Sequence, residues 1–278
     1  MVHCVICNGL GEFFIKNNNI AFYKCQDCSS IFIEPAFILD IDNGKPIIEY
    51  DSKYWNDEVK SSTERSFGTS LARVAEVILY SRRKINKFID VGSGQGFLLD
   101  AIEKYLPESR KKFYGQELFS DSNPRLNFIN GRLNNVNIKF DAGCCIEVIE
   151  HLTPKMFRSL LSDLASVSYP DSIYIFNTGL PEFVEHEDVN YLDGNVRGHI
   201  ISYSIKAIDL IAKEFGFSVL EIPGKTWAFI LEFQPTNYDE INLIDRIWKA
   251  QESNKNLLKN GNESIVLLLG YETCRAYV

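Results

Sequence analysis

The sequence predicts an α/β protein in which helices cover a parallel sheet and a small cysteine-containing ribbon precedes that sheet. Two observations predict this. From about residue 65 onward, helical patterns alternate with short apolar segments, which is typical of a parallel sheet with helical crossovers. Four of the seven cysteines fall in two C-x2-C pairs near the amino terminus. We therefore expect a ribbon over residues 1–35, an aromatic connector over 36–64, a main domain over 65–235 and a carboxy-terminal extension over 236–278.

Composition and charge narrow the class of protein. The 278 residues are 45% hydrophobic and 24% charged, as in ordinary folded proteins. The net charge is −8, which disfavours binding to nucleic acid or to an anionic membrane surface. Apolar runs such as 265–269 are too short to cross a bilayer, and the first residues lack a secretion signal. We expect a cytoplasmic protein that does not insert into membranes.

The ribbon is predicted to bind zinc. Cys4 and Cys7 form one pair, Cys25 and Cys28 form the other, and the 17 intervening residues match the loop of a zinc ribbon. Four thiolates complete a closed tetrahedral shell, which implies a structural metal. Residues 13–16 and 20–24 are expected to form a hairpin. The alternatives are four unliganded cysteines, or a nucleic-acid-binding ribbon, which the few basic residues in 1–35 disfavour. The other cysteines, Cys144, Cys145 and Cys274, are expected to be buried apolar side chains.

The remaining elements follow from apolar periodicity. An amphipathic helix is expected around Leu71, Val74 and Ile78, and another over residues 205–215. In the extension, Ile241, Ile244, Ile247 and Trp248 fall on one side of a predicted helix that packs on the core. The expected strands cover residues 87–91, 113–116, 140–146, 172–177, 217–222, 228–233 and 265–269.

A glycine-rich turn follows the strand 87–91. Gly92, Gly94 and Gly96 allow the backbone to turn sharply and to approach a ligand, and the next helix offers free N–H groups at its start. The spacing G-x-G-x-G is one residue shorter than the dinucleotide motif, and no P-loop lysine follows, so phosphate binding is disfavoured. About 20 residues later, Glu117 ends the next strand, where a carboxylate can accept ribose hydroxyls.

With the segments DVGSGQG and FYGQEL, residues 65–235 resemble the class I S-adenosylmethionine-dependent methyltransferases. The resemblance implies a Rossmann-like fold with a mostly parallel seven-stranded sheet and S-adenosylmethionine as cofactor. It places Asp90 near the methionyl end and Glu117 at the ribose. Asn130 would replace the acidic residue that many relatives place near the adenine. The implied cofactor-binding residues are Asp90, Gly92, Ser93, Gly94, Gly96, Glu117, Leu118 and Asn130.

A second group of polar residues follows the strand 140–146. If the chain turns helical there, Glu147, Glu150 and His151 share one face, and His199 can return to the same pocket. Two carboxylates with imidazoles suit Mg²⁺ or Mn²⁺. The set resembles the metal site of methyltransferases that act on the terminal 2'-hydroxyl of small RNAs or on catechols. His151 and His199 are the candidate catalytic residues. The alternatives are a solvated helix start for the glutamates, a metal-free base for His151 and a capping neighbour for His199.

The loop 181–198 follows the fifth strand, where such a sheet opens toward substrate. Tyr191 and Arg197 are the candidate substrate contacts, and Arg197 would bind a phosphate or carboxylate unless it pairs with nearby acids. We expect methyl transfer to a hydroxyl of a small polar acceptor. A sugar or nucleotide sugar is favoured because a ribbon before such a domain resembles bacterial sugar methyltransferases of glycan and antibiotic pathways. The alternatives are an RNA 2'-O-methyltransferase, a sugar C-methyltransferase and a non-catalytic zinc-ribbon adaptor.

Overall fold

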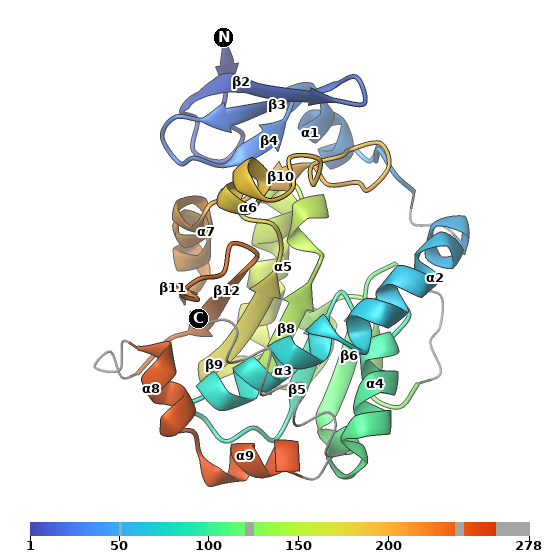
Figure 1. Ribbon diagram of the computed structural model, residues 1–278, viewed down its shortest axis with the longest axis vertical. Helices are drawn as coiled ribbons and strands as arrows, with labels where there is room; N and C mark the ends of the chain where they lie inside the picture. The colour runs from blue at the N-terminus through green and yellow to red at the C-terminus, as the bar shows by residue number, and fades with distance from the viewer. Residues whose placement is uncertain (50–51, 120–124, 237–241, 260–278) are drawn as a thin grey trace.

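The computed structural model describes residues 1–49, 52–119, 125–236 and 242–259 (Figure 1). They form a seven-stranded sheet flanked by helices and a five-stranded sheet at the amino-terminal end. The predicted strand 265–269, Ile241 and Cys274 lie outside the described residues. Within the described ranges, no helix is both long and apolar enough to cross a membrane.

The large sheet has the strand order β11-β12-β9-β8-β5-β6-β7. The five strands from β9 to β7 are parallel, whereas β12 pairs antiparallel with β9 and β11 pairs antiparallel with β12. The predicted α/β fold with a mostly parallel seven-stranded sheet is therefore confirmed. The strands are β5 (Phe88–Val91), β6 (Phe113–Glu117), β7 (Phe128–Asn130), β8 (Phe140–Ile146), β9 (Ser168–Asn177), β11 (Phe217–Glu221) and β12 (Ala228–Phe233).

Two buried apolar clusters cover the two faces of this sheet. One contains the apolar sides of α3 (Thr69–Tyr80) and α4 (Phe97–Tyr105). The other contains those of α5 (Pro154–Ser166) and α7 (Ile205–Ala212). All four residues of β5 are buried, as expected for a central parallel strand covered on both faces. The sheet is thus held rigidly where β5, β6 and β8 end.

The connector contains two helices for which the sequence analysis made no prediction, α1 (Pro35–Asp42) and α2 (Ser52–Ser66). The sequence of α2 is SKYWNDEVKSSTERS, which lacks a continuous apolar stripe. Helical periodicity is therefore weak in α2, and the signal used to find helices fails there.

The described part of the extension forms α8 (Leu243–Trp248) and α9 (Glu252–Lys259), at the bottom of Figure 1. Leu243 and Leu257 are buried and Ile247 packs against them, whereas 78% of Trp248 is exposed. The described part of the extension packs on the core through Leu243, Ile247 and Leu257, whereas Ile244 and Trp248 are exposed.

The ribbon forms four strands at the top of Figure 1: β1 (Val2–His3), β2 (Leu10–Asn17), β3 (Ile20–Cys25) and β4 (Ile31–Ile33). The predicted hairpin corresponds to β2 and β3. Its sheet also includes β10 (Ile201–Ser202), which pairs antiparallel with β4. The main domain therefore completes the sheet of the ribbon.

Candidate functional site

A cleft of about 510 Å³ opens beside the carboxyl ends of β5, β6 and β8. The glycine turn and Glu117 form one wall, and the segment after β8 forms another together with Arg197 and His199. Helix α2 closes the cleft with one face. Among the predicted site residues, those that line the cleft are Asp90, Gly92, Ser93, Gly94, Glu117, Glu147, His151, Arg197 and His199.

The glycine turn has the backbone that its sequence predicts. Gly92, Gly94 and Gly96 have φ values of 70°, 52° and 85°, in the left-handed region that favours glycine. A Cβ on Gly92 would lie 2.5 Å from Cγ2 of Val148. The left-handed backbone and the close approach of Val148 therefore both favour glycine in this turn.

Glu117 lies directly against this turn. Its Oε2 accepts a hydrogen bond of 2.8 Å from the Gly94 N–H, and its Oε1 accepts from the N–H groups of Leu118 and Phe119. These bonds hold the carboxylate in one orientation at the end of β6. The predicted proximity of the glycine turn and the acidic residue is thus present in the structure.

Asp90 is buried near the end of β5 and lines the same cleft. Its Oδ1 accepts a hydrogen bond of 3.3 Å from Sγ of Cys144. Burial raises the pKa of Asp90 to about 6, because the charged carboxylate loses its water, although hydrogen bonds from Ser93 and Cys144 oppose the shift.

Three candidate cofactor residues do not line the cleft: Gly96, Leu118 and Asn130. Asn130 is exposed and pairs with Glu117 across β6 and β7, so it lies beside the acidic residue at the sheet edge. Leu118 is 49% exposed next to Glu117. Gly96 caps α4 with its left-handed backbone. Asn130 and Leu118 thus flank Glu117, whereas Gly96 shapes the turn.

Glu150, His151 and His199 converge. One potential ligand atom from each lies within 4.8 Å of the others. The chain after β8 forms a single 3₁₀ turn, Ile149–His151, in place of the expected α-helix. Glu147 has a left-handed backbone, with φ of 55°, and lines the cleft, where its Oε1 accepts from Asn177. Glu147 is therefore close to the three-residue cluster but not part of it.

Both histidines present Nε2 to this cluster. Nδ1 of His151 lies 3.1 Å from the Gly198 carbonyl oxygen, and Nδ1 of His199 lies 2.8 Å from that of Tyr191. Because a carbonyl can only accept, the ring proton belongs on Nδ1 and the lone pair on Nε2. Burial lowers the pKa of His151 to about 4 and that of His199 to about 2, so both rings are neutral at pH 7.

Glu150 completes the cluster with a buried carboxyl group. It is fully buried, and its polar side-chain neighbours include Thr178 and Glu147. Oε1 lies 3.9 Å from Nε2 of His199. Burial and the nearby Glu147 raise the pKa of Glu150 well above its usual range. One carboxylate and two neutral imidazoles, oriented by backbone carbonyls, fit a divalent cation.

The four amino-terminal cysteines also fit a metal. Their sulfur atoms all lie within 4.8 Å of one another, with 3.7 Å between Cys4 and Cys28 and 3.5 Å between Cys7 and Cys25. A tetrahedral zinc with bonds of about 2.3 Å places its sulfur atoms about 3.8 Å apart. The geometry of the thiols therefore fits a closed zinc shell. Cys144 and Cys145 are buried in β8, as expected.

The two candidate substrate residues have different surroundings. Arg197 lines the cleft, with 49% of its side chain exposed, and its Nη1 lies 3.6 Å from Asp188. Tyr191 is buried and does not line the cleft. Its hydroxyl accepts a hydrogen bond from the Gly179 N–H. Its carbonyl orients His199, so Tyr191 supports the cluster from behind.

Sequence reasoning missed the contribution of α2. Tyr54, Glu58 and Arg65 recur at intervals of four and seven residues and line the cleft from one helical face. Burial raises the pKa of Tyr54 to about 12. The recurrence of these polar residues at helical spacing is the signal that could have identified them.

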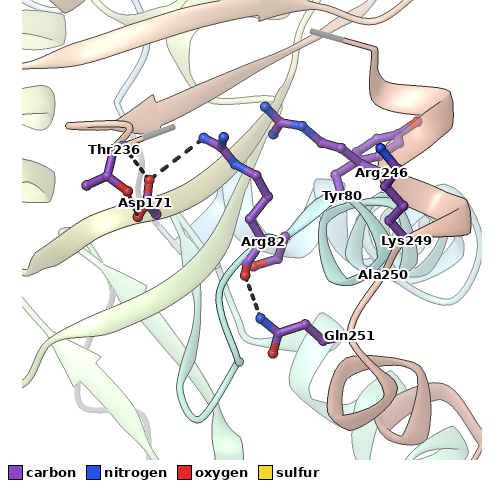
Figure 2. Close-up of a pocket in the computed structure, with 9 residues that line it drawn as sticks. Tyr80, Arg82, Asp171, Thr236, Arg246, Lys249, Ala250 and Gln251 are labelled. Atoms are coloured by element: carbon purple, nitrogen blue, oxygen red, sulfur yellow. Dashed lines mark hydrogen bonds and ion pairs between the residues drawn. The ribbon is translucent and has the colours of Figure 1, made fainter. Parts of the chain in front are cut away.

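A second cavity, of 380 Å³, lies away from the cleft near α8 (Figure 2). Arg82 points toward Asp171 there, and both Arg82 and Arg246 pair with Glu232. The charges of Arg82, Arg246, Asp171 and Glu232 thus compensate one another in this cavity.

Comparison with known proteins decides the family. A family model described as a methyltransferase domain matches residues 62–222, more than half of the chain. The chain belongs to this methyltransferase family. The enzyme class predicted from the sequence, an S-adenosylmethionine-dependent methyltransferase, is confirmed. No curated protein matches the chain.

Solved structures share the fold of this methyltransferase. An O-methyltransferase family protein from Burkholderia thailandensis is 12% identical, with a TM-score of 0.50, over 68% of this chain and 61% of that one. DesVI from Streptomyces venezuelae is 13% identical, with a TM-score of 0.49, over 68% of this chain and 100% of that one. At such identities, the likeness concerns the fold alone.

Proposed function

We propose that this methyltransferase transfers the methyl group of S-adenosylmethionine to a hydroxyl of a small polar acceptor. The favoured acceptor is a sugar or nucleotide sugar of a bacterial glycan or natural-product pathway. One observation carries the proposal: the glycine turn with Glu117 and the two histidines line a single cleft. A donor held at the first group would face an acceptor held at the second.

The donor end consists of Asp90, the glycine turn and Glu117. Oε1 of Glu117 already accepts two backbone hydrogen bonds, which leaves Oε2 with capacity for a ribose hydroxyl. Leu118 and Asn130 lie beside Glu117, and we propose that they contact the adenine. S-adenosylmethionine supplies an activated methyl group, so the protein must mainly align the acceptor and help to remove its proton.

The acceptor end is the cluster of Glu150, His151 and His199. We propose that it holds Mg²⁺ or Mn²⁺ with Glu147 nearby, since the ligand atoms of one carboxyl group and two neutral imidazoles lie within 4.8 Å of one another. A bound cation would stabilise the ionised form of Glu150, which burial and Glu147 otherwise disfavour. A bound cation would lower the pKa of the acceptor hydroxyl. Without the cation, the neutral Nε2 of His151, which lines the cleft, would take the proton as a general base.

Two arginines support an acceptor with a negatively charged group. Arg197 and Arg65 reach the cleft from different elements. Among the described residues, Arg65 has no ion pair, whereas Arg197 has only the long contact to Asp188. The diphosphate of a nucleotide sugar could bind between them. The four cysteines are proposed to hold a structural Zn²⁺ in the ribbon.

The direct test is an activity screen. The purified protein is incubated with S-adenosylmethionine, Mn²⁺ or Mg²⁺ and a panel of free sugars and nucleotide sugars, and release of S-adenosylhomocysteine is measured. We expect release with nucleotide sugars, and we expect the mass of the methylated product to exceed that of the acceptor by one CH2 group. Binding of S-adenosylmethionine with turnover only on RNA would replace the acceptor assignment, and no donor binding would favour the adaptor alternative.

An RNA acceptor is the second candidate, favoured by the two histidines beside a glutamate pair. The ribose of a terminal nucleotide also presents vicinal hydroxyls to a cation. The net charge of −8 disfavours it, because phosphate binding gains most of its free energy from basic side chains. A small RNA with a free 3' end is therefore included in the same panel.

A further inference from the structure

The sheet of the ribbon continues into the methyltransferase domain. Strand β10 pairs with β4, with Ile201 opposite Phe32 and Ser202 opposite Ile31. Phe32 and Ile201 are fully buried in one apolar cluster, which also contains Cys4, Cys25 and Cys28. Figure 1 shows β10 directly beneath the ribbon. The candidate zinc site and the main domain therefore share one core.

Ile200 joins this strand pair to the histidine cluster. Its carbonyl accepts a hydrogen bond of 2.9 Å from the N–H of Ile33 in β4, and its own N–H donates one of 2.8 Å to the carbonyl of Glu150. The preceding residue is His199, and the Gly198 carbonyl orients His151. The three residues 198–200 thus contact every member of the cluster and the ribbon as well.

The second cysteine pair is fixed to the same segment. Ser204 follows β10, and its hydroxyl donates to the carbonyl of Cys28. Its N–H donates a hydrogen bond of 3.0 Å to Oγ of Ser30, which is fully buried. Only two residues separate Cys28 from the start of β4. A displacement of Cys28 would therefore move both the start of β4 and the residue Ser204 that follows β10.

We propose that the ribbon is a positioning element of the acceptor end of the cleft. Zinc bound by Cys4, Cys7, Cys25 and Cys28 holds β4 against β10, and this pairing fixes Glu150, His151 and His199 in their converged arrangement. The inference rests on the proposed function for the role of the cluster. The donor end, formed by Gly94 and Glu117, has no such connection to the ribbon in the described residues, so it is independent of zinc.

The physical basis is the small size of the ribbon. About 35 residues cannot bury enough apolar surface to hold a fold without a metal or another support. Without zinc, β4 loses the fixed start that the Cys25–Cys28 turn provides. The two-residue strand β10 pairs with β4. When β4 moves, β10 loses this pairing, and the preceding segment 198–200 can shift with it.

Histidine nuclear magnetic resonance tests this directly, because the chain has only four histidines. Histidine labelled with ¹⁵N is incorporated, and ring signals are compared between zinc-loaded wild type and Cys7→Ser after dialysis against a chelator. Cys7 is the least buried ligand, so its change disturbs packing least. We expect the signals of His151 and His199 to shift or broaden, whereas that of the exposed His186 stays in place.

Calorimetry and Mn²⁺ titration complete the comparison. In Cys7→Ser, the affinity for S-adenosylmethionine should stay within about twofold of wild type, while the Mn²⁺ needed to broaden the two signals should rise about tenfold or more. Phe13→Ala, an exposed change on β2, is the matched control and should alter neither value.

Unchanged His151 and His199 signals in zinc-free Cys7→Ser would overturn the proposal. If that variant does not fold, stepwise removal of zinc from the wild type with a chelator decides, and loss of zinc from the folded protein with unchanged His151 and His199 signals would overturn the proposal equally. If Mn²⁺ does not broaden the wild-type signals, the metal part of the proposed function fails, and the comparison without Mn²⁺ still decides the positioning role.

Discussion

The backbone N–H of Gly94 donates a hydrogen bond of 2.8 Å to Oε2 of Glu117. This contact joins the turn after β5 to the end of β6, so two segments 23 residues apart form one wall of the cleft. The hydrogen bond places the glycine turn and the carboxylate at the same proposed donor site. Separate substitutions of Gly94 and Glu117 test the role of each.

Replacement of Gly94 should abolish donor binding. In Gly94→Asp, the new carboxylate would lie beside Glu117 and repel it, and the left-handed backbone would disfavour the side chain. Calorimetry with S-adenosylmethionine should show no measurable heat of binding. Gly44→Asp is the control, because Gly44 has a φ of 83° with open space around it. An unchanged affinity in Gly94→Asp would contradict the placement of the donor.

The charge of Glu117 should contribute to donor affinity. Glu117→Gln keeps the shape but replaces a charged acceptor, and hydrogen bonds to charged groups contribute about 1.5–3 kcal/mol. We expect the dissociation constant for S-adenosylmethionine to rise about 10- to 100-fold. Glu221→Gln, at the exposed end of β11, should leave it unchanged. Equal affinities in the two variants would remove Glu117 from the ribose site.

His199 should couple activity to the divalent cation. His199→Ala removes one Nε2 from the cluster, so turnover and its dependence on Mn²⁺ should fall together, by about tenfold or more. Donor affinity should not change, because His199 belongs to the proposed acceptor end and not to the glycine turn or Glu117. His186→Ala is the matched control at an exposed position. An active variant that resists chelators would exclude the cation from the mechanism.

Asp90 should make stability depend on pH. Burial raises its pKa from 3.8 to about 6 in the folded protein, so the folded state holds this proton more tightly than the unfolded chain. Its contribution to stability is complete below pH 3.8 and is lost as the pH rises through about 6. The full difference corresponds to about 3 kcal/mol.

The variant Asp90→Asn removes this dependence. Urea unfolding at several pH values should show equal stability of variant and wild type below about pH 4, and a more stable variant above about pH 6. Asp209→Asn, at a position paired with Lys213 on the surface of α7, provides the comparison. If the difference in the free energy of unfolding between Asp90→Asn and wild type stayed constant across this pH range, the raised pKa of Asp90 would be contradicted.

Local patterns predicted the donor end of the site because its residues are close in sequence to the strands that carry them. Gly94 follows a buried strand, and Glu117 ends the next one. The sequence analysis did not predict strand β7, because three residues are too few to show alternation. The position of β7 at the sheet edge depends on its pairing with β6, in which Asn130 lies opposite Glu117. The cleft-facing role of Arg65 was missed because α2 is polar on most of its surface.

The acceptor end depends on contacts between distant segments. The sequence predicted that Glu150, His151 and His199 would meet, but the α-helical argument for Glu147 did not hold, since a 3₁₀ turn follows β8. The pairing of Ile201 with Phe32 spans more than half of the chain and involves a two-residue strand. No periodicity can reveal such a contact, because tertiary packing alone decides it.

The pairing of β4 with β10 also bears on how this protein could be dissected. The family match starts at residue 62, so a chain shortened to the matched region would omit β4 and leave the hydrogen-bonding edge of β10 and the buried side of Ile201 facing water. Uncovered edges of this kind favour self-association. The ribbon is therefore better regarded as an integral wall of the enzyme than as a detachable module that could be exchanged between relatives.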